Sequence, residues 1–371
     1  MTTPYADRLE AVKAAGTFRT LTDLVIDGKY VEMGGHRLLN LSSNDYLGLQ
    51  AMPELRREFL ESGGADLPFS SSSSRLLSGN DRAYREFEEL LSSAYHKPSA
   101  LLWDSGFHAN SGIIPVLGGK DTFFLLDRLV HASIIEGIKL SGSGFTRFRH
   151  NDVQNLEAQL RRFAGEYKQV WVVVESVYSM DGDLAPLREI ADLKHLFPNM
   201  MLYVDEAHGV GLFGGGLGLA AETGTLSGVD LLLGTLGKAL GSVGAFSLQS
   251  PELRSLFISS ARPFIYSTAL PPFNVAWSRF LFERVLMMDD RRAHLRQIMS
   301  LLDPDLESPI KSVIIPDRID EAVSALTEAG YFVRPIRRPT VPAGTERLRL
   351  SLTAALTEAD LLTLKSLLST F

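Results

Sequence analysis

Short apolar runs alternate with longer helical stretches from about residue 84 onward, and this alternation constrains the fold more than any other feature. The apolar runs read ALLWD, TFFLLD, VWVVVES, MLYVDEAHG, DLLLGT and GAFSLQ. Runs without polar alternation are typical of strands that are buried on both faces of a parallel sheet. We therefore expect an α/β domain whose mainly parallel sheet is covered by helices on both faces.

The length of 371 residues exceeds the roughly 100 to 200 residues of a typical domain, so one large or two interlocked domains are expected. The alternating region predicts a large domain over residues 45–262. Residues 263–371 begin with a long helical stretch and continue with mixed strand and helix signals, which predicts a smaller α+β domain. Residues 1–44 predict an N-terminal segment with a short amphipathic helix and a hairpin. Thr357 and Asp360 form an approximate capping box that predicts a last helix.

Charge and residue usage argue against several classes of function. The chain has 37 Lys and Arg against 44 Asp and Glu, and no basic tract is longer than a pair, so a nucleic-acid partner is not expected. No apolar run approaches the roughly 20 residues that span a bilayer, and the first residues lack an apolar signal core. We expect a cytoplasmic protein without a membrane partner. The absence of cysteine excludes disulfides, thiolate metal sites and a cysteine nucleophile.

Familiar motifs for other chemistries are broken or missing. The pair Gly237 and Lys238 is not a P-loop, because Leu232 stands where that motif needs its first glycine and Ala239 where it needs Ser or Thr. Glycines in segment 214–218 lack the dinucleotide-binding spacing and indicate turns instead. The motif G-x-S-x-G does not occur, so a serine-hydrolase elbow is not expected. The motif H-E-x-x-H does not occur either, and a metal site at Asp205, Glu206 and His208 is only a minor alternative.

Two successive apolar runs lead into residues with reactive side chains. The first ends in Asp205, with His208 three residues later, and the second is followed by Lys238 in a glycine-flanked turn. The carboxyl ends of parallel strands meet at one edge of a sheet, so we expect these side chains to share one crevice. A lysine amine can form a Schiff base with pyridoxal phosphate, an aspartate can stabilise the protonated pyridine nitrogen, and a histidine can donate to the phenolic oxygen. Such a lysine alone is usually a solvated surface residue, but the strand-terminal Asp205 favours the cofactor hypothesis.

A phosphate site and a second histidine extend this hypothesis. The segment DSGFHANSG predicts a turn and a helix start, where Gly106 and Phe107 would lead the helix and its backbone N–H groups would bind phosphate. Thr235 lies three residues before Lys238 and would add a hydroxyl. His131 could stack on the cofactor ring, although a histidine that lines the core explains this position equally well.

Eight segments run in order through nearly the whole chain: SSNDYLGL (42–49), SGFHAN (105–110), DRLVHASIIEG (127–137), SVYSMDGD (176–183), YVDEAHGVG (203–211), TLGKALG (235–241), IYSTALPP (265–272) and RPTVPAGTERLRLSLTA (338–354). In this order they resemble the motifs of the pyridoxal-phosphate-dependent α-oxoamine synthases. The resemblance implies an aspartate-aminotransferase-like fold, with a mainly parallel seven-stranded sheet flanked by helices and a smaller α+β C-terminal domain. It also implies a homodimer with active sites at the subunit interface.

The resemblance assigns a role to each matching position. It makes Lys238 the Schiff-base lysine, Asp205 the partner of the pyridine nitrogen, His208 the donor to the phenolic oxygen and His131 the stacking ring. At the cofactor it adds Ser179, and at the phosphate it adds Gly106, Phe107, Thr235 and, from the neighbouring subunit, Thr268. Near the substrates it adds Asn44, Arg349 as the carboxylate clamp, and Arg19 at the acyl group. Arg347 points the same way as Arg349 on a strand, so either arginine could be the clamp.

The activity that the resemblance implies is the decarboxylative condensation of an amino acid with an acyl thioester. Three of the segments are most similar to the members that condense L-alanine with pimeloyl-CoA, or with pimeloyl-acyl carrier protein, in biotin biosynthesis. The alternatives are a member that uses glycine or serine with another acyl-CoA, such as 2-amino-3-ketobutyrate ligase, 5-aminolevulinate synthase or serine palmitoyltransferase, and a catalytically silent partner subunit.

The chain departs from the family pattern away from the cofactor residues. A serine run at 70–74, followed by Arg75, replaces a glycine-rich loop, and side chains in place of hydrogen restrict the backbone there. Leu356 replaces a histidine after the arginine strand, and the stretch around 297–313 is shorter than usual. The serine run leaves the preferred length of the acyl chain open.

Overall fold

A computed structural model describes residues 3–371, and their contacts divide the chain into two compact units. The large unit comprises residues 52–179 and 183–292, and the small unit comprises the residues up to 51 together with 180–182 and 293–371. This grouping differs from the expected boundaries at 44 and 262. Residues 263–292 join the large unit, in which α11 (Pro272–Val285) packs against α3 (Arg82–Ala94). The expected N-terminal segment joins C-terminal residues in the small unit.

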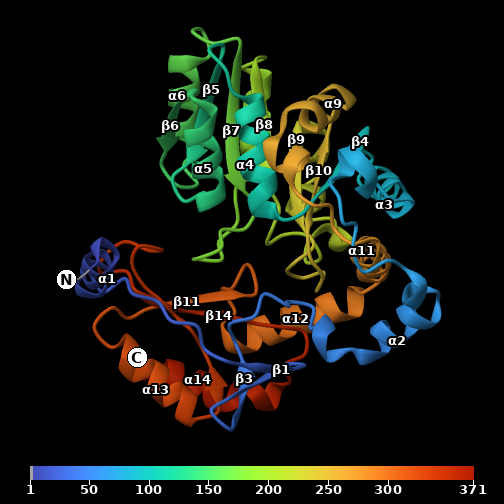
Figure 1. Ribbon diagram of the computed structural model, residues 1–371. Coiled ribbons are helices and arrows are strands. Elements are labelled where there is room, and N and C mark those ends of the chain that lie inside the picture. The colour runs from blue at the N-terminus through green and yellow to red at the C-terminus, as the bar shows by residue number, and fades with distance from the viewer. Residues whose placement is uncertain (1–2) are drawn as a thin grey trace. The chain divides into compact units, whose positions relative to one another are not determined.

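The large unit contains a seven-stranded sheet within the described part of the chain, as the family resemblance implied (Figure 1). Its strand order is β4-β10-β9-β8-β7-β5-β6. Among the described strands of this sheet, β10 alone runs in the opposite direction to the other six, so the sheet is mainly parallel. The strands are β4 (Ser99–Trp103), β5 (Thr122–Asp127), β6 (Gly144–Phe148), β7 (Gln169–Glu175), β8 (Met200–Asp205), β9 (Leu231–Thr235) and β10 (Ala245–Gln249).

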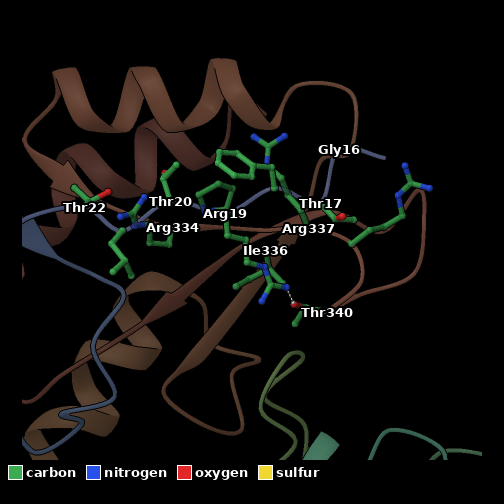
Figure 2. Close-up of a pocket in the computed structure, with 13 residues that line it drawn as sticks. Gly16, Thr17, Arg19, Thr20, Thr22, Arg334, Ile336, Arg337 and Thr340 are labelled. Carbon is green, nitrogen blue, oxygen red and sulfur yellow. Dashed lines mark hydrogen bonds between the residues drawn. The ribbon is translucent and has the colours of Figure 1, made fainter. Parts of the chain in front are cut away.

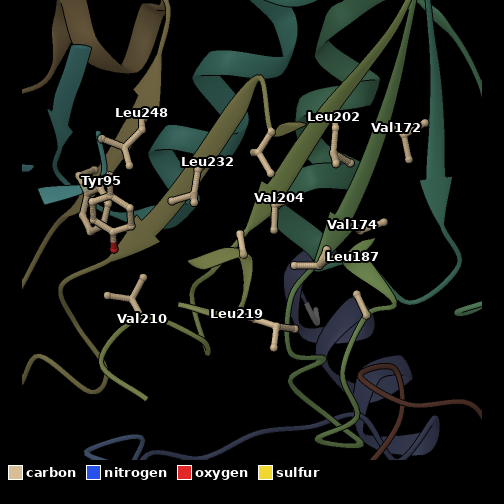
Figure 3. Close-up of a cluster of buried hydrophobic side chains, with 14 of the residues drawn as sticks. Tyr95, Val172, Val174, Leu187, Leu202, Val204, Val210, Leu219, Leu232 and Leu248 are labelled. Atoms are coloured by element: carbon tan, nitrogen blue, oxygen red, sulfur yellow. The ribbon is translucent and has the colours of Figure 1, made fainter. Parts of the chain in front are cut away.

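Side chains of the central strands alternate between two apolar layers. Along β7, Val172 and Val174 belong to one buried cluster, whereas Trp171 and Val173 belong to the other. Figure 3 shows the first cluster, in which valine and leucine side chains from neighbouring strands lie together on one face of the sheet. Burial on both faces explains why these strands have unbroken apolar sequences, since each buried valine or leucine contributes roughly 1.5 to 3 kcal/mol.

Helices cover both faces of this sheet (Figure 1), as the sequence predicted. The helices that contribute to the first cluster are α3, α6 (Val153–Phe163), α7 (Leu187–Asp192), α8 (Leu219–Glu222) and α11. Those that contribute to the second are α4 (Gly106–Leu117), α5 (Ala132–Ser141), α9 (Pro251–Ser260) and α10 (Arg262–Tyr266). The large unit also contains α2 (Pro53–Glu61), and α12 (Asp289–Leu302) begins in it and continues into the small unit.

The small unit contains two short sheets, with strand orders β1-β2-β3-β12 and β11-β14-β13. Its strands are β1 (Val25–Asp27), β2 (Tyr30–Met33), β3 (His36–Asn40), β11 (Ile310–Ile314), β12 (Tyr331–Phe332), β13 (Pro335–Ile336) and β14 (Arg347–Ser351). Its other helices are α1 (Pro4–Ala14), α13 (Ile319–Glu328) and α14 (Glu358–Leu368). In the first sheet, β12 pairs in parallel with β3, so the two ends of the chain share one sheet.

Local signals explain where helices of the small unit begin. The expected capping box opens α14, because the Asp360 carboxylate accepts the Thr357 backbone N–H at 2.7 Å. The N-terminal helix is present as α1, with the apolar side chains of Tyr5, Leu9 and Val12 exposed. Within residues 3–371, no helix combines the length and the apolar character that a membrane crossing requires.

Candidate functional site

The predicted lysine, histidine and aspartate lie at one edge of the large sheet. Strands β8 and β9 run in parallel, with Asp205 opposite Leu233, so their carboxyl ends meet at that edge. Lys238 follows the end of β9, and its Nζ lies 2.7 Å from Nε2 of His208, which follows the end of β8. The glycine-flanked turn thus places Lys238 against a specific partner rather than in bulk solvent.

Asp205 is buried, with 4% of its surface exposed, and its two carboxylate oxygens have separate donors. Oδ1 accepts the Ala207 backbone N–H at 2.9 Å, and Oδ2 accepts a hydrogen from Nδ2 of Asn110, also at 2.9 Å. A buried carboxylate with two fixed donors has a defined orientation. It is the group that a protonated ring nitrogen would require.

Asn110 connects Asp205 with His131 through side chains that the sequence analysis did not identify. The Asn110 amide donates to Asp205 and, at 3.0 Å, to Oγ of Ser133, while its oxygen accepts the hydroxyl of Tyr203. Oγ of Ser133 lies 2.8 Å from Nδ1 of His131. Asn110 is the last residue of the motif SGFHAN and lies on the buried face of α4. Its place on that helix face was the only signal that could have indicated its role as a link between Asp205 and Ser133.

The contacts of His131 fix which of its ring nitrogens carries the proton. The Ser133 backbone N–H points to Nδ1 at 3.3 Å, so Nδ1 is an acceptor and the proton of the neutral ring lies on Nε2. Burial lowers the pKa of His131, the nearby charge of Asp205 opposes this effect, and Lys238 adds to it. His131 is therefore a neutral ring near both residues, with one N–H available as a hydrogen-bond donor.

Glu175 and Glu206 are two further buried carboxyl groups near Asp205. Burial raises the pKa of Glu206 to about 7, although hydrogen bonds from Ser176 and from the backbone of α8 oppose the increase. Burial and the charge of Asp205 also raise the pKa of Glu175 well above its ordinary value, while Lys238 opposes them. In the part of the chain that the structure describes, no group of three or more His, Asp or Glu side chains could hold a metal ion.

The expected phosphate-binding residues lie at the start of α4 and the end of β9. Ser105 caps α4, because its Oγ accepts the His108 backbone N–H at 3.1 Å, and Gly106 is the first residue of the helix. A side chain at Gly106 would meet no neighbouring atom within 4 Å, so the space before the helix is open. The backbone N–H groups of the first turn are suited to an anion there. At the end of β9, Oγ1 of Thr235 hydrogen bonds to the Gly244 carbonyl at 3.2 Å.

The other expected cofactor residues also lie in the large unit. Phe107 is half exposed in the first turn of α4, and Ser179 is partly buried after β7. Thr268 is exposed after α10, where a residue that serves a second subunit would have to be. Its role in a neighbouring active site stays a prediction.

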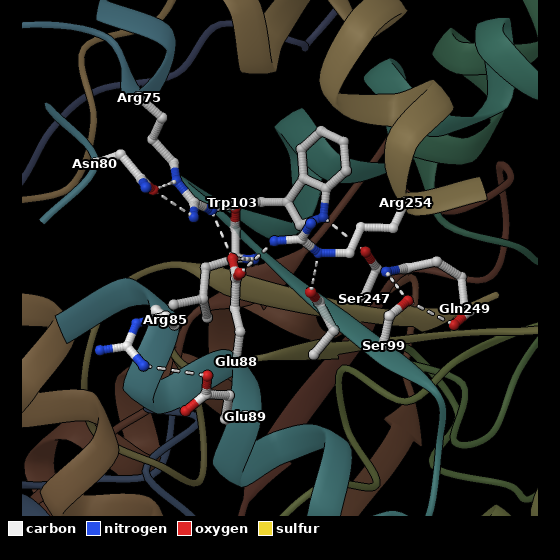
Figure 4. Close-up of polar contacts among 12 residues, drawn as sticks. Arg75, Asn80, Arg85, Glu88, Glu89, Ser99, Trp103, Ser247, Gln249 and Arg254 are labelled. Atoms are coloured by element: carbon white, nitrogen blue, oxygen red, sulfur yellow. Dashed lines mark hydrogen bonds and ion pairs between the residues drawn. The ribbon is translucent and has the colours of Figure 1, made fainter. Parts of the chain in front are cut away.

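Arg75, which directly follows the serine run, contacts Glu88 of α3 (Figure 4). Nη1 of Arg75 lies 2.6 Å from Oε1 of Glu88, and Nη2 of Arg254 lies 2.8 Å from the other oxygen of that carboxylate. Oε1 of Glu88 also accepts the Leu102 backbone N–H of β4 at 3.0 Å. Within the run, Ser72 has φ of 50°, a conformation that glycine adopts more readily, which agrees with the glycine-rich loop expected here.

The expected amino-acid clamp lies in the small unit. Arg349 is buried on β14, where Nη1 donates to Oδ1 of Asn44 at 2.9 Å and Nη2 to the hydroxyl of Tyr46 at 3.1 Å. Arg347 forms an ion pair with Asp181 and donates from Nε to the Thr345 carbonyl at 3.0 Å. The guanidinium of Arg347 is thus directed toward Asp181, and that of Arg349 toward Asn44. Asn44 and Arg349 are brought together as expected.

The chain is similar to known proteins over most of its length. The model of the aminotransferase class I and II family matches residues 36–366. A Haemophilus influenzae protein assigned as an 8-amino-7-oxononanoate synthase is 45% identical over 366 residues, which cover 95% of this chain and 96% of that protein. The chain is also similar to a serine palmitoyltransferase variant from S. paucimobilis with a bound PLP–myriocin aldimine (TM-score 0.88, 29% identity, 99% and 96% coverage). A further similar structure is 8-amino-7-oxononanoate synthase from Francisella tularensis (TM-score 0.75, 27% identity, 90% and 97% coverage).

Proposed function

The chain belongs to the aminotransferase class I and II family, and from this premise we propose that it condenses L-alanine with a pimeloyl thioester. The products are 8-amino-7-oxononanoate, carbon dioxide and the free thiol of CoA or acyl carrier protein, in a step of biotin biosynthesis. A carbon–carbon bond forms between the α-carbon of alanine and the thioester carbonyl. The carbon–sulfur bond and the bond to the alanine carboxylate break.

The observation that carries this proposal is the contact of Lys238 with His208 at the sheet edge where Asp205 ends β8. This donor set fits pyridoxal phosphate, because it offers an amine for the aldehyde, a buried carboxylate for the ring nitrogen and a histidine for the phenolic oxygen. The open start of α4 and Thr235 would hold the phosphate. When bound, this cofactor supplies an electron sink that stabilises negative charge at the α-carbon.

The chain's own residues then have distinct tasks. Nζ of Lys238 takes the proton from the α-carbon of alanine and later returns a proton there. The N–H on Nε2 of His131 donates to the oxygen of the thioester carbonyl as negative charge develops on it. Asn110 holds the Asp205 carboxylate and, through Ser133, the His131 ring in fixed orientations. Arg349 binds the substrate carboxylate as a charged, bidentate donor.

We also propose that the active form is a homodimer to which Thr268 contributes across the interface. The large unit has a cavity of about 520 Å³ lined by α4, α5, α9 and α10, and Leu140 and Leu256 on its wall are exposed in the single chain. Exposed leucines beside a cavity favour a second copy as the cover. Light scattering of the purified protein would test this, and a monomer with full activity would contradict it.

A substrate panel tests the reaction itself. Alanine, glycine and serine are each supplied with pimeloyl-CoA, pimeloyl-acyl carrier protein and palmitoyl-CoA, and the released thiol and carbon dioxide are measured. We expect turnover to be fastest with alanine and a pimeloyl thioester. A preference for glycine or serine would identify a sibling activity, and no turnover with any pair would identify a silent subunit.

A further inference from the structure

A cavity of about 580 Å³ lies wholly within the small unit (Figure 2). Two segments form its wall: residues 16–22, which precede β1, and residues 334–340, which contain β13. Four arginines and four threonines are among its thirteen lining residues, whereas Asp and Glu are not: Arg19, Arg334, Arg337, Arg338, Thr17, Thr20, Thr22 and Thr340. We call this cavity the arginine pocket.

The arginine pocket is more positive than its own ion pairs can neutralise. Arg337 pairs with Asp320, and Nε of Arg338 lies 3.7 Å from Oε1 of Glu346. Among residues 3–371, no carboxylate is within ion-pair distance of the Arg19 or Arg334 guanidinium. The chain as a whole has a formal net charge of −7, so this concentration of positive charge is local. Like charges at one site repel, and an anionic ligand would relieve that repulsion.

The two arginines without a carboxylate are held by weaker contacts. Nη2 of Arg19 donates to Oγ1 of Thr340 at 3.2 Å, which joins the two segments of the wall. The Arg334 guanidinium lies 5.4 Å from the centre of the Phe332 ring. Both side chains are exposed, so a ligand can reach them. Guanidinium groups with neighbouring hydroxyls are typical phosphate-binding groups.

The size and composition of the arginine pocket favour a nucleotide over a single phosphate. A volume of about 580 Å³ is within the range of pockets that bind small organic molecules. Phe18, Leu21 and Ile336 give the wall apolar surface for a base, beside the arginines and threonines. The nucleotide half of CoA combines a base with three phosphate groups, whereas a carrier-protein arm has a single phosphodiester.

We infer that the arginine pocket binds the phosphate groups of the nucleotide half of a CoA thioester. This inference rests on the proposed function, because it names which acyl donor the enzyme takes. Arg19 and Arg334 would bind phosphate directly, so this inference assigns Arg19 to the nucleotide rather than to the acyl group that the family resemblance implied. Arg337 and Arg338, already paired with carboxylates, would add positive charge around the site.

Titration calorimetry on the cofactor-loaded protein tests the inference with CoA, dephospho-CoA and pantetheine as probes. In the double variant Arg19→Gln and Arg334→Gln, we expect the Kd for CoA to increase about 10- to 100-fold, because two charged hydrogen-bonding groups are lost. The increase should be smaller for dephospho-CoA, and the affinity for pantetheine should not change. The matched control is Arg296→Gln, an exposed arginine on α12 outside the arginine pocket, which should bind CoA like the wild type.

Unchanged CoA binding in the double variant would overturn the inference, as would equal affinity of the wild type for CoA and pantetheine. An equal loss of turnover with CoA-bound and carrier-bound pimeloyl groups would overturn the nucleotide assignment. CoA binding is measured without alanine, so it is independent of the reaction. Arginine-dependent CoA binding without condensation of alanine would contradict only the proposed function, and condensation with an unchanged KM for pimeloyl-CoA in the double variant would contradict only this inference.

Discussion

Asp205 is buried, Lys238 is partly buried beside His208, and the exposed ring of His131 is held at Nδ1 by Ser133, whereas the arginines of the arginine pocket lie on loops open to solvent. The first group, which we call the lysine site, has few charges, and its carboxylate is buried away from solvent. The second relies on several charges that salt screens over about 8 Å at physiological ionic strength. With the roles that we propose for them, the two regions would make catalysis and substrate binding depend on different physical conditions within one chain.

The largest effect is expected at the lysine site itself. Lys238→Ala removes the amine that binds the cofactor and moves the α-proton, so turnover should decrease by roughly 10⁴-fold or more. The visible absorption of the cofactor-loaded protein should disappear as well. Lys120→Ala, at an exposed lysine before β5, is the matched control and should keep both signals. A Lys238→Ala protein that keeps the absorption band would disprove the assignment.

A smaller loss is expected when only the charge of the buried acid is removed. Asp205→Asn keeps the shape of the side chain but no longer stabilises a protonated ring nitrogen, so kcat should decrease by about 10²- to 10³-fold. Cofactor binding should persist in part, because the other contacts remain. Steady-state kinetics and cofactor titration measure the two effects separately. Wild-type kcat in this variant would contradict the electron-sink argument.

The ion pairs of His150 in the large unit should make the free energy of unfolding depend on pH. The arginines of the arginine pocket do not titrate, so they should give no such dependence. Burial lowers the pKa of His150, but hydrogen bonds to Asp127 at 2.9 Å and Asp183 at 2.6 Å raise it to about 10. Because this pKa exceeds the ordinary value of 6.5, the stabilisation is complete below pH 6.5 and is lost as the pH increases toward 10. His150→Gln should lower the free energy of unfolding by about 2 kcal/mol at pH 6 and by less at pH 9.

Denaturant unfolding at both pH values measures this difference. An equal destabilisation at pH 6 and pH 9 would show that the charge of His150 makes no contribution. The wild-type protein at the same pH values provides the reference for each measurement.

The network behind Asp205 should have a moderate effect on rate. Asn110→Ala removes the donor that joins Asp205 to Ser133, so kcat should decrease about tenfold while KM for alanine changes little. The pH profile should also shift, because the charge of Asp205 then has one donor fewer. Gln154→Ala on exposed α6 surface is the control. A change in KM alone, with an unaltered pH profile, would indicate a merely structural role.

Salt should produce the smallest effect and the clearest contrast between the two regions. An increase in ionic strength from about 0.05 to 0.5 M should raise KM for pimeloyl-CoA about threefold, since the arginines are exposed. Asp205 is buried and Lys238 is in direct contact with His208, so kcat should hardly change. Initial rates at fixed alanine concentration measure both constants. A decrease in kcat at constant KM would show that the lysine site, and not the arginine pocket, is the salt-sensitive region.

Much of the fold could be predicted because a strand that is buried on both faces has an unbroken run of apolar residues. Unbroken apolar runs predicted the parallel sheet. The positions of Asp205, His208 and Lys238 at the ends of two of these runs predicted that they would lie at one edge of the sheet, where the structure places them. The antiparallel direction of β10 could not be predicted, because a buried run looks the same in either direction. The grouping of residues 263–292 with the large unit depends on packing rather than on local pattern.

The remaining site residues depend on long-range contacts. Asn110 acquires its role only when α4 brings it beside Asp205, 95 residues later in the chain. Arg347 and Arg349 share one face of β14, and they are distinguished by their partners, which are Asp181 for Arg347 and Asn44 for Arg349. The hydrophobic periodicity of the sequence gives no information about such long-range contacts between side chains. The family resemblance supplied Asn44 and Arg349 as candidates, and the geometry placed them in contact.

The parallel pairing of β3 with β12 has a consequence for biosynthesis. Strand β3 ends at Asn40, but its partner at Tyr331 leaves the ribosome about 290 residues later, a delay of roughly 15 to 60 s. The large unit is nearly continuous in sequence and can fold during this interval. The N-terminal strands must therefore wait for the last part of translation, and a nascent chain that stalls before Tyr331 exposes an open β-edge to aggregation and to chaperones.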